Sequence, residues 1–285
     1  MANTIDIRRR IRSVKNTQQI TRAMKMVAAA KLRRAHDRIV AARPYSAALR
    51  EVLVSVATRV ESVEHPLLRE REEKRVLFVI VTADKGLCGA FNANVIKGAT
   101  NTLRDRDWPE VQLIPIGRKG NDFFRRRQIP IRHQAVNIFQ ALALGHATDI
   151  AKTISDDFVS EKVDAVYVIY NEFRSVIQQT LRIERLLPLE RLSEEQALEA
   201  VEYLYEPSPE LILQELLPKH IEFQIYRILL ESAAAEHGAR MTAMESATKN
   251  ASELIDSLTL TYNRIRQASI TKEIIEIVSG AAAAK

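Results

Sequence analysis

The side chains that most often perform chemistry are few and scattered in this sequence. Its six histidines show no metal-ligand spacing, and no serine or cysteine lies in a nucleophile-elbow context. Adjacent carboxylates occur at Asp156–Asp157 and Glu194–Glu195, in segments that we expect to be helix or loop, where solvation is the ordinary explanation. We therefore expect no catalytic residue, no metal site and no cofactor, and we do not expect the chain to be an enzyme by itself.

One glycine-containing turn has a place where a phosphate could bind. In VTADKGLCGAFN, Gly86 and Gly89 follow an apolar run and precede a helical segment, so a phosphate could lie at the helix N-terminus. The turn lacks the spacing of a dinucleotide fingerprint and the Gly-Lys-Ser/Thr of a P-loop. We favour a turn that packs closely against its sheet. Cys88 is the single cysteine, which excludes an internal disulfide and indicates a reducing compartment.

The composition is that of a folded protein with enough apolar side chains to form a core. The 285 residues are 46% hydrophobic and 27% charged, enough for one large core or two smaller ones. No apolar run reaches the ~20 residues that a transmembrane helix needs. The first residues, MANTIDIRRRIRSVK, contain no signal-peptide core, so we expect a cytoplasmic start.

Positive charge is concentrated at the beginning of the chain. Residues 1–50 hold 13 of the 42 Lys/Arg and two of the 36 Asp/Glu, a net +11, which leaves 29 bases and 34 acids, or −5, in the remainder. Such asymmetry indicates an anionic partner or a solvated helix face. The alternative function is a basic coiled-coil protein that binds nucleic acid. We disfavour it because arginines share the segment with the heptads and no aromatic residues are interleaved.

Both ends of the chain predict long helices that pair with each other. All eight glycines lie beyond residue 85, and apolar or small residues recur in steps of three and four in both terminal segments. Pro44 is expected to kink or restart the first helix. The steps run through Ile7, Ile11, Val14, Thr21, Met24, Ala28, Leu32, Ala35, Ile39, Ala42, Leu49, Val52, Val56 and Val60, and after Lys219 through Met244, Ala247, Ala251, Leu254, Leu258, Thr261, Ile265 and Ala268.

Between these ends the sequence alternates strand and helix patterns. The run RVLFVIV reads as a buried parallel strand, and VQLIPIG and DAVYVIYNEF read as further strands separated by helical segments. The predicted fold is therefore α/β, with a central Rossmann-like domain at 75–206. A long antiparallel coiled coil formed by the two chain termini, 1–70 with 207–285, completes it.

The C-terminal segment leaves apolar side chains without an obvious partner. Its isoleucines form a stripe that could continue the coiled-coil seam, but Ile275 and the alanine tail add apolar surface beyond one seam. An uncovered apolar stripe lowers solubility, so we expect other chains to cover it. The candidate contact residues are the donors Arg264, Arg266 and Gln267 and the apolar residues Ile270, Ile274, Ile275, Ile277 and Val278.

Several long segments together resemble one family along the whole chain, the gamma subunits of bacterial F-type ATP synthases. The similar segments are IRRRIRSVKNTQQITRAMKMVAAAKLRRA, DKGLCGAFN, YLYEPSP, ARMTAMESATKNASELI and YNRIRQASITKEIIEIVSGAAA. The chain lacks the cysteine-bearing insertion of chloroplast members and an organellar transit peptide, which favours a bacterial protein.

The resemblance implies a non-catalytic rotor shaft that couples proton-driven rotation of a membrane c-ring to the catalytic beta subunits. Implied partners are three alpha and three beta subunits, the epsilon subunit and the c-ring, with no nucleic acid and no cofactor. The implied location is the cytoplasmic face of the bacterial plasma membrane, as a peripheral subunit. The implied beta contacts are Arg22, Met24, Lys25, Arg264, Arg266 and Gln267, the tip is the isoleucine segment, and the c-ring or epsilon contacts are Tyr203, Tyr205 and Glu206.

Overall fold

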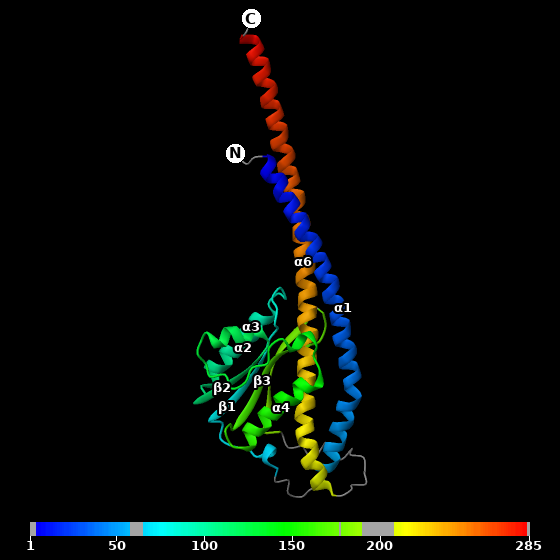
Figure 1. The fold of residues 1–285 in the computed structure, drawn as a ribbon, viewed down its shortest axis with the longest axis vertical. Helices are drawn as coiled ribbons and strands as arrows, with labels where there is room; N and C mark the ends of the chain where they lie inside the picture. Colours follow the sequence, from blue (N-terminus) through cyan, green and yellow to red (C-terminus); the bar gives the residue numbers. More distant parts are fainter. Residues whose placement is uncertain (1–3, 58–64, 177, 190–207, 284–285) are drawn as a thin grey trace. The chain divides into compact units, whose positions relative to one another are not determined.

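The computed structural model describes residues 4–57, 65–176, 178–189 and 208–283 (Figure 1). The chain forms two compact units. We call Met1–Ala28 with Met241–Lys285 the helical unit, and Ala29–Arg240 the sheet unit.

A mixed four-stranded sheet forms the centre of the sheet unit. Its strands are β1 (Arg75–Val81), β2 (Glu110–Ile116), β3 (Ala165–Phe173) and β4 (Gln179–Leu187). Their order across the sheet is β2-β1-β3-β4, and β1 pairs in parallel with both β2 and β3. β4 pairs antiparallel with β3. β1 is buried from Val76 to Val81 because helices cover both faces, which explains its unbroken apolar sequence.

The two faces of the sheet carry different helices (Figure 1). α2 (Phe91–Arg106) and α3 (Arg118–Arg125) cover one face, where Val95 and Phe124 pack against Phe78 of β1. On the other face α4 (Leu144–Val159) packs together with the parts of the two long helices that belong to the sheet unit. Short 3-10 helices η1 (Pro66–Leu68) and η2 (Ile138–Gln140) lie in the connections.

The two long helices are α1 (Thr4–Ala57) and α6 (Pro209–Ala283), and they run antiparallel. In the sheet unit the Tyr45 ring stacks on Phe223 with centroids 4.1 Å apart. The predicted seam of α1 is confirmed within the described residues, because every seam residue from Ile7 to Val56 is buried or half-buried. Val60 lies outside the described residues. Small seam residues allow close approach, and Ala28 is only 1% exposed.

The structure corrects three expected boundaries. α1 does not restart at Pro44, since the helix is continuous through it. α6 begins at Pro209, earlier than the expected Lys219: Ser208 Oγ accepts a hydrogen bond from the Leu211 N–H at 3.4 Å, and proline suits the first helical position. The sequence NIFQALALGHATDIAKTISDDFV predicts one helix from Asn137, but the helix begins only at Leu144, because Asn137 has a left-handed backbone with φ 64°.

The predicted division into a shaft (1–70 with 207–285) and a central domain (75–206) assigns both long helices to one part. The compact units instead divide each long helix, after Ala28 in α1 and after Arg240 in α6. The predicted division stays a prediction.

Candidate protein-interaction surface

Within the helical unit, two polar contacts fix how α1 and α6 pair. The Thr21 and Thr248 hydroxyl oxygens are 2.8 Å apart, and Lys25 Nζ donates to Glu245 Oε1 at 2.6 Å. Thr4 lies 17 residues before Thr21, and Ile265 lies 17 residues after Thr248. The start of α1 therefore lies opposite the turn of α6 around Ile265.

The last turns of α6 continue past the start of α1 (Figure 1). All residues from Arg266 to Ser279 are exposed. We call this segment the α6 tip. Its apolar residues are exposed by 49% at Ile270, 55% at Ile274, 58% at Ile275, 72% at Ile277 and 62% at Val278. Within the described residues the isoleucine stripe thus does not continue the seam, and a contiguous apolar surface of this kind indicates a contact with another protein.

The polar residues predicted near the tip are also exposed. Arg264 and Gln267 have exposed side chains, and the Arg266 guanidinium lies 6.0 Å from the centre of the Tyr262 ring. Their donors are available to a partner, and they lie immediately before the apolar segment.

The predicted contact residues of α1 have mixed environments. Arg22 is exposed, whereas Met24 is half-buried against the seam. Lys25 already pairs with Glu245, with both side chains substantially exposed to solvent. An ion pair in such a setting contributes little to stability, so Lys25 can exchange its partner at small cost.

The sequence reasoning missed apolar residues on the outer face of α1. Ile20, Met26 and Val27 are each more than half exposed, although they lie in the same helical unit as the predicted contacts. Ile20 and Val27 are seven residues apart and off the seam, a spacing that marks a second helical stripe. The seven-residue spacing of Ile20 and Val27 could have predicted this second stripe from the sequence.

The turn that contains Gly86 and Gly89 is bonded to its own chain. Asp84 Oδ1 accepts hydrogen bonds from the backbone N–H groups of Arg118 and Asn137, at 3.0 and 2.7 Å. The Gly86 carbonyl accepts a bond from Arg240 Nη2 at 3.2 Å, and Cys88 is buried. Burial raises the pKa of the Cys88 thiol, which disfavours the reactive thiolate.

A buried charge cluster on α6 holds this turn. Arg240 Nη2 lies 2.6 Å from Glu236 Oε1, and the two side chains are 12% and 7% exposed. Burial raises the pKa of Glu236, and Arg240 opposes that shift. Burial together with the neighbouring charges of Arg240 and Lys31 lowers the pKa of His237 to about 4, so this histidine is neutral at physiological pH.

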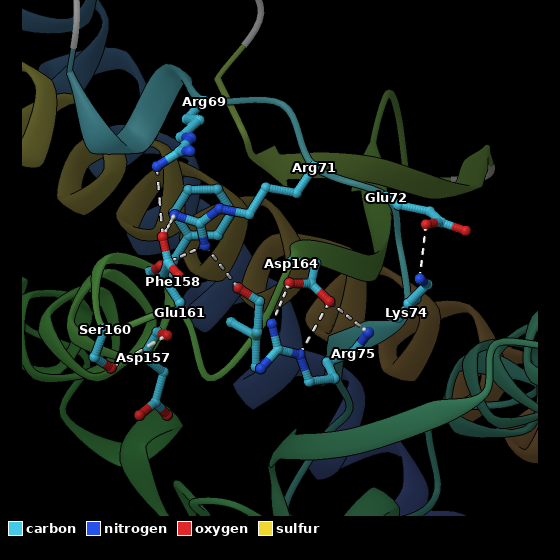
Figure 2. A network of polar contacts seen from close by, with 11 residues as sticks. Arg69, Arg71, Glu72, Lys74, Arg75, Asp157, Phe158, Ser160, Glu161 and Asp164 are labelled. Carbon is cyan, nitrogen blue, oxygen red and sulfur yellow. Dashed lines mark hydrogen bonds and ion pairs between the residues drawn. The ribbon is translucent and has the colours of Figure 1, made fainter.

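A second polar network joins Arg71, before β1, and Arg75, at its start, to the end of α4 and the loop that precedes β3 (Figure 2). Arg75 donates to Asp164 from its backbone N–H and from two guanidinium nitrogens, at 2.9, 3.1 and 2.7 Å. Arg71 Nη1 donates to the carbonyls of Phe158 and Val163 at 3.0 and 3.4 Å. The hydrogen bonds from Arg75 lower the pKa of Asp164, which keeps the carboxylate charged. The network anchors the sheet unit rather than forming a reaction centre.

Three predicted residues, Tyr203, Tyr205 and Glu206, lie outside the described residues. Within the part of the chain that the structure describes, no group of three or more histidine, cysteine, aspartate or glutamate side chains could hold a metal ion. No helix in the described ranges is both long and apolar enough to cross a membrane.

A paired-helix unit with an uncovered apolar end, joined to an α/β unit, defines a subunit built for contacts with other proteins. Comparison with known proteins gives its family. A family model described as ATP synthase matches residues 3–284. The ATP synthase gamma chain of Solibacter usitatus (strain Ellin6076) is 54% identical over 289 residues, covering 100% of both chains. The gamma chain of Geobacter sp. (strain M21) is 51% identical over 287 residues, again covering 100% of both.

Solved structures show the same fold. A chain in the central stalk and c-ring structure of Tetrahymena thermophila mitochondrial ATP synthase has a TM-score of 0.61 and 28% identity, covering 80% of this chain and 99% of that one. A chain in the Euglena gracilis mitochondrial ATP synthase structure of OSCP, F1 and c-ring has a TM-score of 0.68, covering 98% of this chain and 94% of that one. At 20% identity the second likeness concerns the fold alone.

The chain belongs to the ATP synthase gamma chain family. It is a non-catalytic central-stalk subunit of an F-type ATP synthase, in which the beta subunits carry out catalysis. The predicted fold class and family are confirmed, and the alternative of a nucleic-acid-binding coiled coil is not supported.

Proposed function

We propose that the chain is the rotating shaft of a bacterial F-type ATP synthase. In this proposal, proton flow turns a membrane c-ring, the shaft turns with it, and each catalytic beta subunit is driven through its nucleotide-affinity states. Full-length similarity to bacterial gamma chains supports this role. The observation that carries it is the α6 tip, a helix end whose isoleucines have no partner helix in the described chain.

The chemistry of the tip suits a bearing inside a ring of three alpha and three beta subunits. Apolar contact is non-directional, so its energy changes little as one surface turns against another. Strong hydrogen bonds have angular preferences and would favour particular orientations. Ile274, Ile277 and Val278 therefore suit a sliding contact.

Transmission of torque needs contacts that form and break at defined angles. Arg266 and Gln267, just below the isoleucines, offer exposed donors to a beta loop, with Arg264 beside them. Arg22 and Lys25, near Met24, offer positive charge to an acidic beta segment. A hydrogen bond to a charged group contributes about 1.5–3 kcal/mol, strong enough to couple and weak enough to release.

The remaining assigned contacts would hold the subunit at the membrane. We assign Tyr203, Tyr205 and Glu206 to the c-ring and epsilon subunit, on the resemblance of YLYEPSP to the family's segment. With these contacts the chain would sit on the cytoplasmic face of the bacterial plasma membrane as a peripheral subunit.

The tip is tested by the double substitution Ile274→Ser/Ile277→Ser. Both side chains are more than half exposed, so the isolated chain should unfold at an unchanged urea concentration. Covering each one in the complex contributes about 1–2 kcal/mol, so assembly with alpha and beta subunits should weaken at least tenfold. Co-purification of the complex with subunit mass measurement gives the readout. The matched control is Lys249→Ser/Asn250→Ser, an exposed pair on the same helix, which should assemble normally; normal assembly of the isoleucine variant would refute the covered tip.

The drive contacts are tested in the assembled complex. Arg266→Ala/Gln267→Ala should lower ATP turnover or assembly, because it removes the donors next to the bearing. Met24→Lys should add an ion pair with beta and reduce the ATP made per proton. Unchanged turnover in the first variant, or unchanged coupling in the second, would remove the assigned role.

A further inference from the structure

An open groove lies between α2 and α3, which are side by side on one face of the sheet (Figure 1). Its volume is about 710 Å³, within the range of roughly 300–1,000 Å³ that small-molecule sites occupy. Ala93 and Ile96 of α2 and Phe123 of α3 contribute apolar surface to it. The groove is therefore large enough for a ligand with an apolar body.

The charged residues of the groove are almost all basic. Lys97 of α2 and Lys119, Arg126 and Arg127 in and after α3 line it, against the single acid Asp122. The groove therefore carries a net charge of about +3, counted from these side chains at neutral pH.

One of these cations is held in place by an aromatic ring. The guanidinium carbon of Arg127 lies 3.5 Å from the centre of the Phe123 ring. Arg127 Nη1 also donates to the Phe123 carbonyl at 3.4 Å. Stacking over a ring fixes the plane of a guanidinium and leaves its remaining N–H groups free to bind an anion.

The other three cations are not neutralised by an ion pair in the part of the chain that the structure describes. Within the described residues, Lys97, Lys119 and Arg126 form no ion pair. Two arginines elsewhere in the sheet unit are paired, Arg75 with Asp164 and Arg132 with Asp157. Unpaired like charges around one groove repel each other, and a bound anion would offset that repulsion.

We infer that the α2–α3 groove binds a small polyphosphate, either free or as the di- or triphosphate group of a nucleotide. A polyphosphate concentrates several negative charges within a few ångströms, which matches cations gathered around one groove. An acidic peptide spreads its carboxylates along a chain and suits a longer surface. Arginine guanidinium groups also bind phosphate oxygens in a bidentate manner. The inference stands apart from the shaft function and does not depend on it.

The test uses titration calorimetry of the full chain at near-physiological ionic strength, with inorganic tripolyphosphate, ATP and adenosine as probes. We expect saturable one-to-one binding of tripolyphosphate and ATP, and none of adenosine. Similar affinity for the first two would assign recognition to the phosphate chain alone. Tighter binding of ATP would show that the nucleoside contacts the apolar residues of the groove.

Charge-reversal variants locate the site. Arg126→Glu/Arg127→Glu on one wall and Lys97→Glu on the other should each weaken binding at least tenfold. Circular dichroism should be unchanged, because these positions are exposed. The matched control is Arg33→Glu/Arg34→Glu, an adjacent exposed pair on α1 with the same change in net charge, which should bind within twofold of the wild type.

Three results would overturn the inference. Equal weakening in the groove and control variants would show attraction to net charge rather than to a site. Tighter binding of a poly-glutamate peptide than of tripolyphosphate would assign the groove to an acidic protein. Absence of saturable binding by the wild-type chain would leave the cations as a solvated surface.

Discussion

Replacing Arg240 with methionine should destabilise the sheet unit by about 3–5 kcal/mol, the usual cost of breaking a buried ion pair by removing one partner. In the native chain Arg240 Nη2 lies 2.6 Å from Glu236 Oε1 and 3.2 Å from the Gly86 carbonyl oxygen. Methionine fills similar volume but donates no hydrogen bond. The Glu236 carboxylate would then be buried without its cation, and the turn at Gly86 would lose its contact with α6.

The double substitution Glu236→Leu/Arg240→Met should be milder than the single one. It removes both buried charges together and replaces them with apolar side chains, a change that is often near neutral. We expect a cost of about 1–2 kcal/mol, which includes the lost hydrogen bond to Gly86. The single variant Arg240→Met would thus be rescued by a second substitution, which simple loss of packing would not produce.

The pH dependence of the single variant gives an independent check of the reasoning. Burial raises the pKa of Glu236, and removal of Arg240 takes away the charge that opposes the shift. A carboxyl group with a raised folded-state pKa stabilises the fold below its unfolded pKa, near 4.3, and loses this contribution as pH rises through the folded pKa. The deficit of Arg240→Met should therefore shrink as the pH falls from 7 to 5.

Urea unfolding monitored by tryptophan fluorescence measures these differences. Trp108 is the single tryptophan and packs near Phe78 and Tyr167 in the sheet unit, so its emission reports on that unit. Two outcomes would refute the reasoning: a single variant no less stable than the double variant, or a deficit that grows on acidification.

Two further predictions concern the sheet unit. Asp164→Asn should cost about 2 kcal/mol at pH 7, because Asp164 accepts three bonds from Arg75. Since the pKa of Asp164 is lowered, its contribution is present above the unfolded pKa of about 4 and is lost as the pH falls through the lower pKa of the folded state, so urea unfolding should show a smaller difference between the two proteins at pH 3 than at pH 7. Gly117→Ala should destabilise by about 3 kcal/mol or more, because φ is 87° and a Cβ would overlap the Thr82 carbonyl, whereas Gly145→Ala, with open space around its Cβ, should stabilise α4 by up to about 1 kcal/mol in scanning calorimetry.

Periodicity was the part of the sequence that predicted structure most directly. The three-four step identified the seam of α1, and the unbroken run at 75–81 identified a strand buried on both faces. The residues at which helices begin were harder to predict from the sequence, because they depend on contacts with distant parts of the chain. Asn137 leaves the helical conformation where its N–H bonds to Asp84, a residue more than fifty positions earlier. No local pattern contains that information.

The candidate surface was predicted in outline, because exposed isoleucines at the end of a helix contradict the usual burial of such residues. The sequence could not show where α1 begins relative to α6, and that register determines how much of α6 is left uncovered. The groove between α2 and α3 escaped sequence analysis for a related reason. Its cations come from α2, from α3 and from the residues just after α3, and only the fold brings Lys97 and Arg126, 29 positions apart in the chain, to one groove.

The uncovered end of α6 also has a consequence for the order in which the enzyme is built. Exposed apolar side chains at the end of a helix can bind a second copy of the same helix as well as a partner subunit. Newly synthesised copies of the subunit would therefore aggregate if they remained unassembled for long. If alpha and beta subunits cover the α6 tip as proposed, cells would gain from keeping synthesis of this subunit matched to, or slightly behind, that of the alpha and beta subunits.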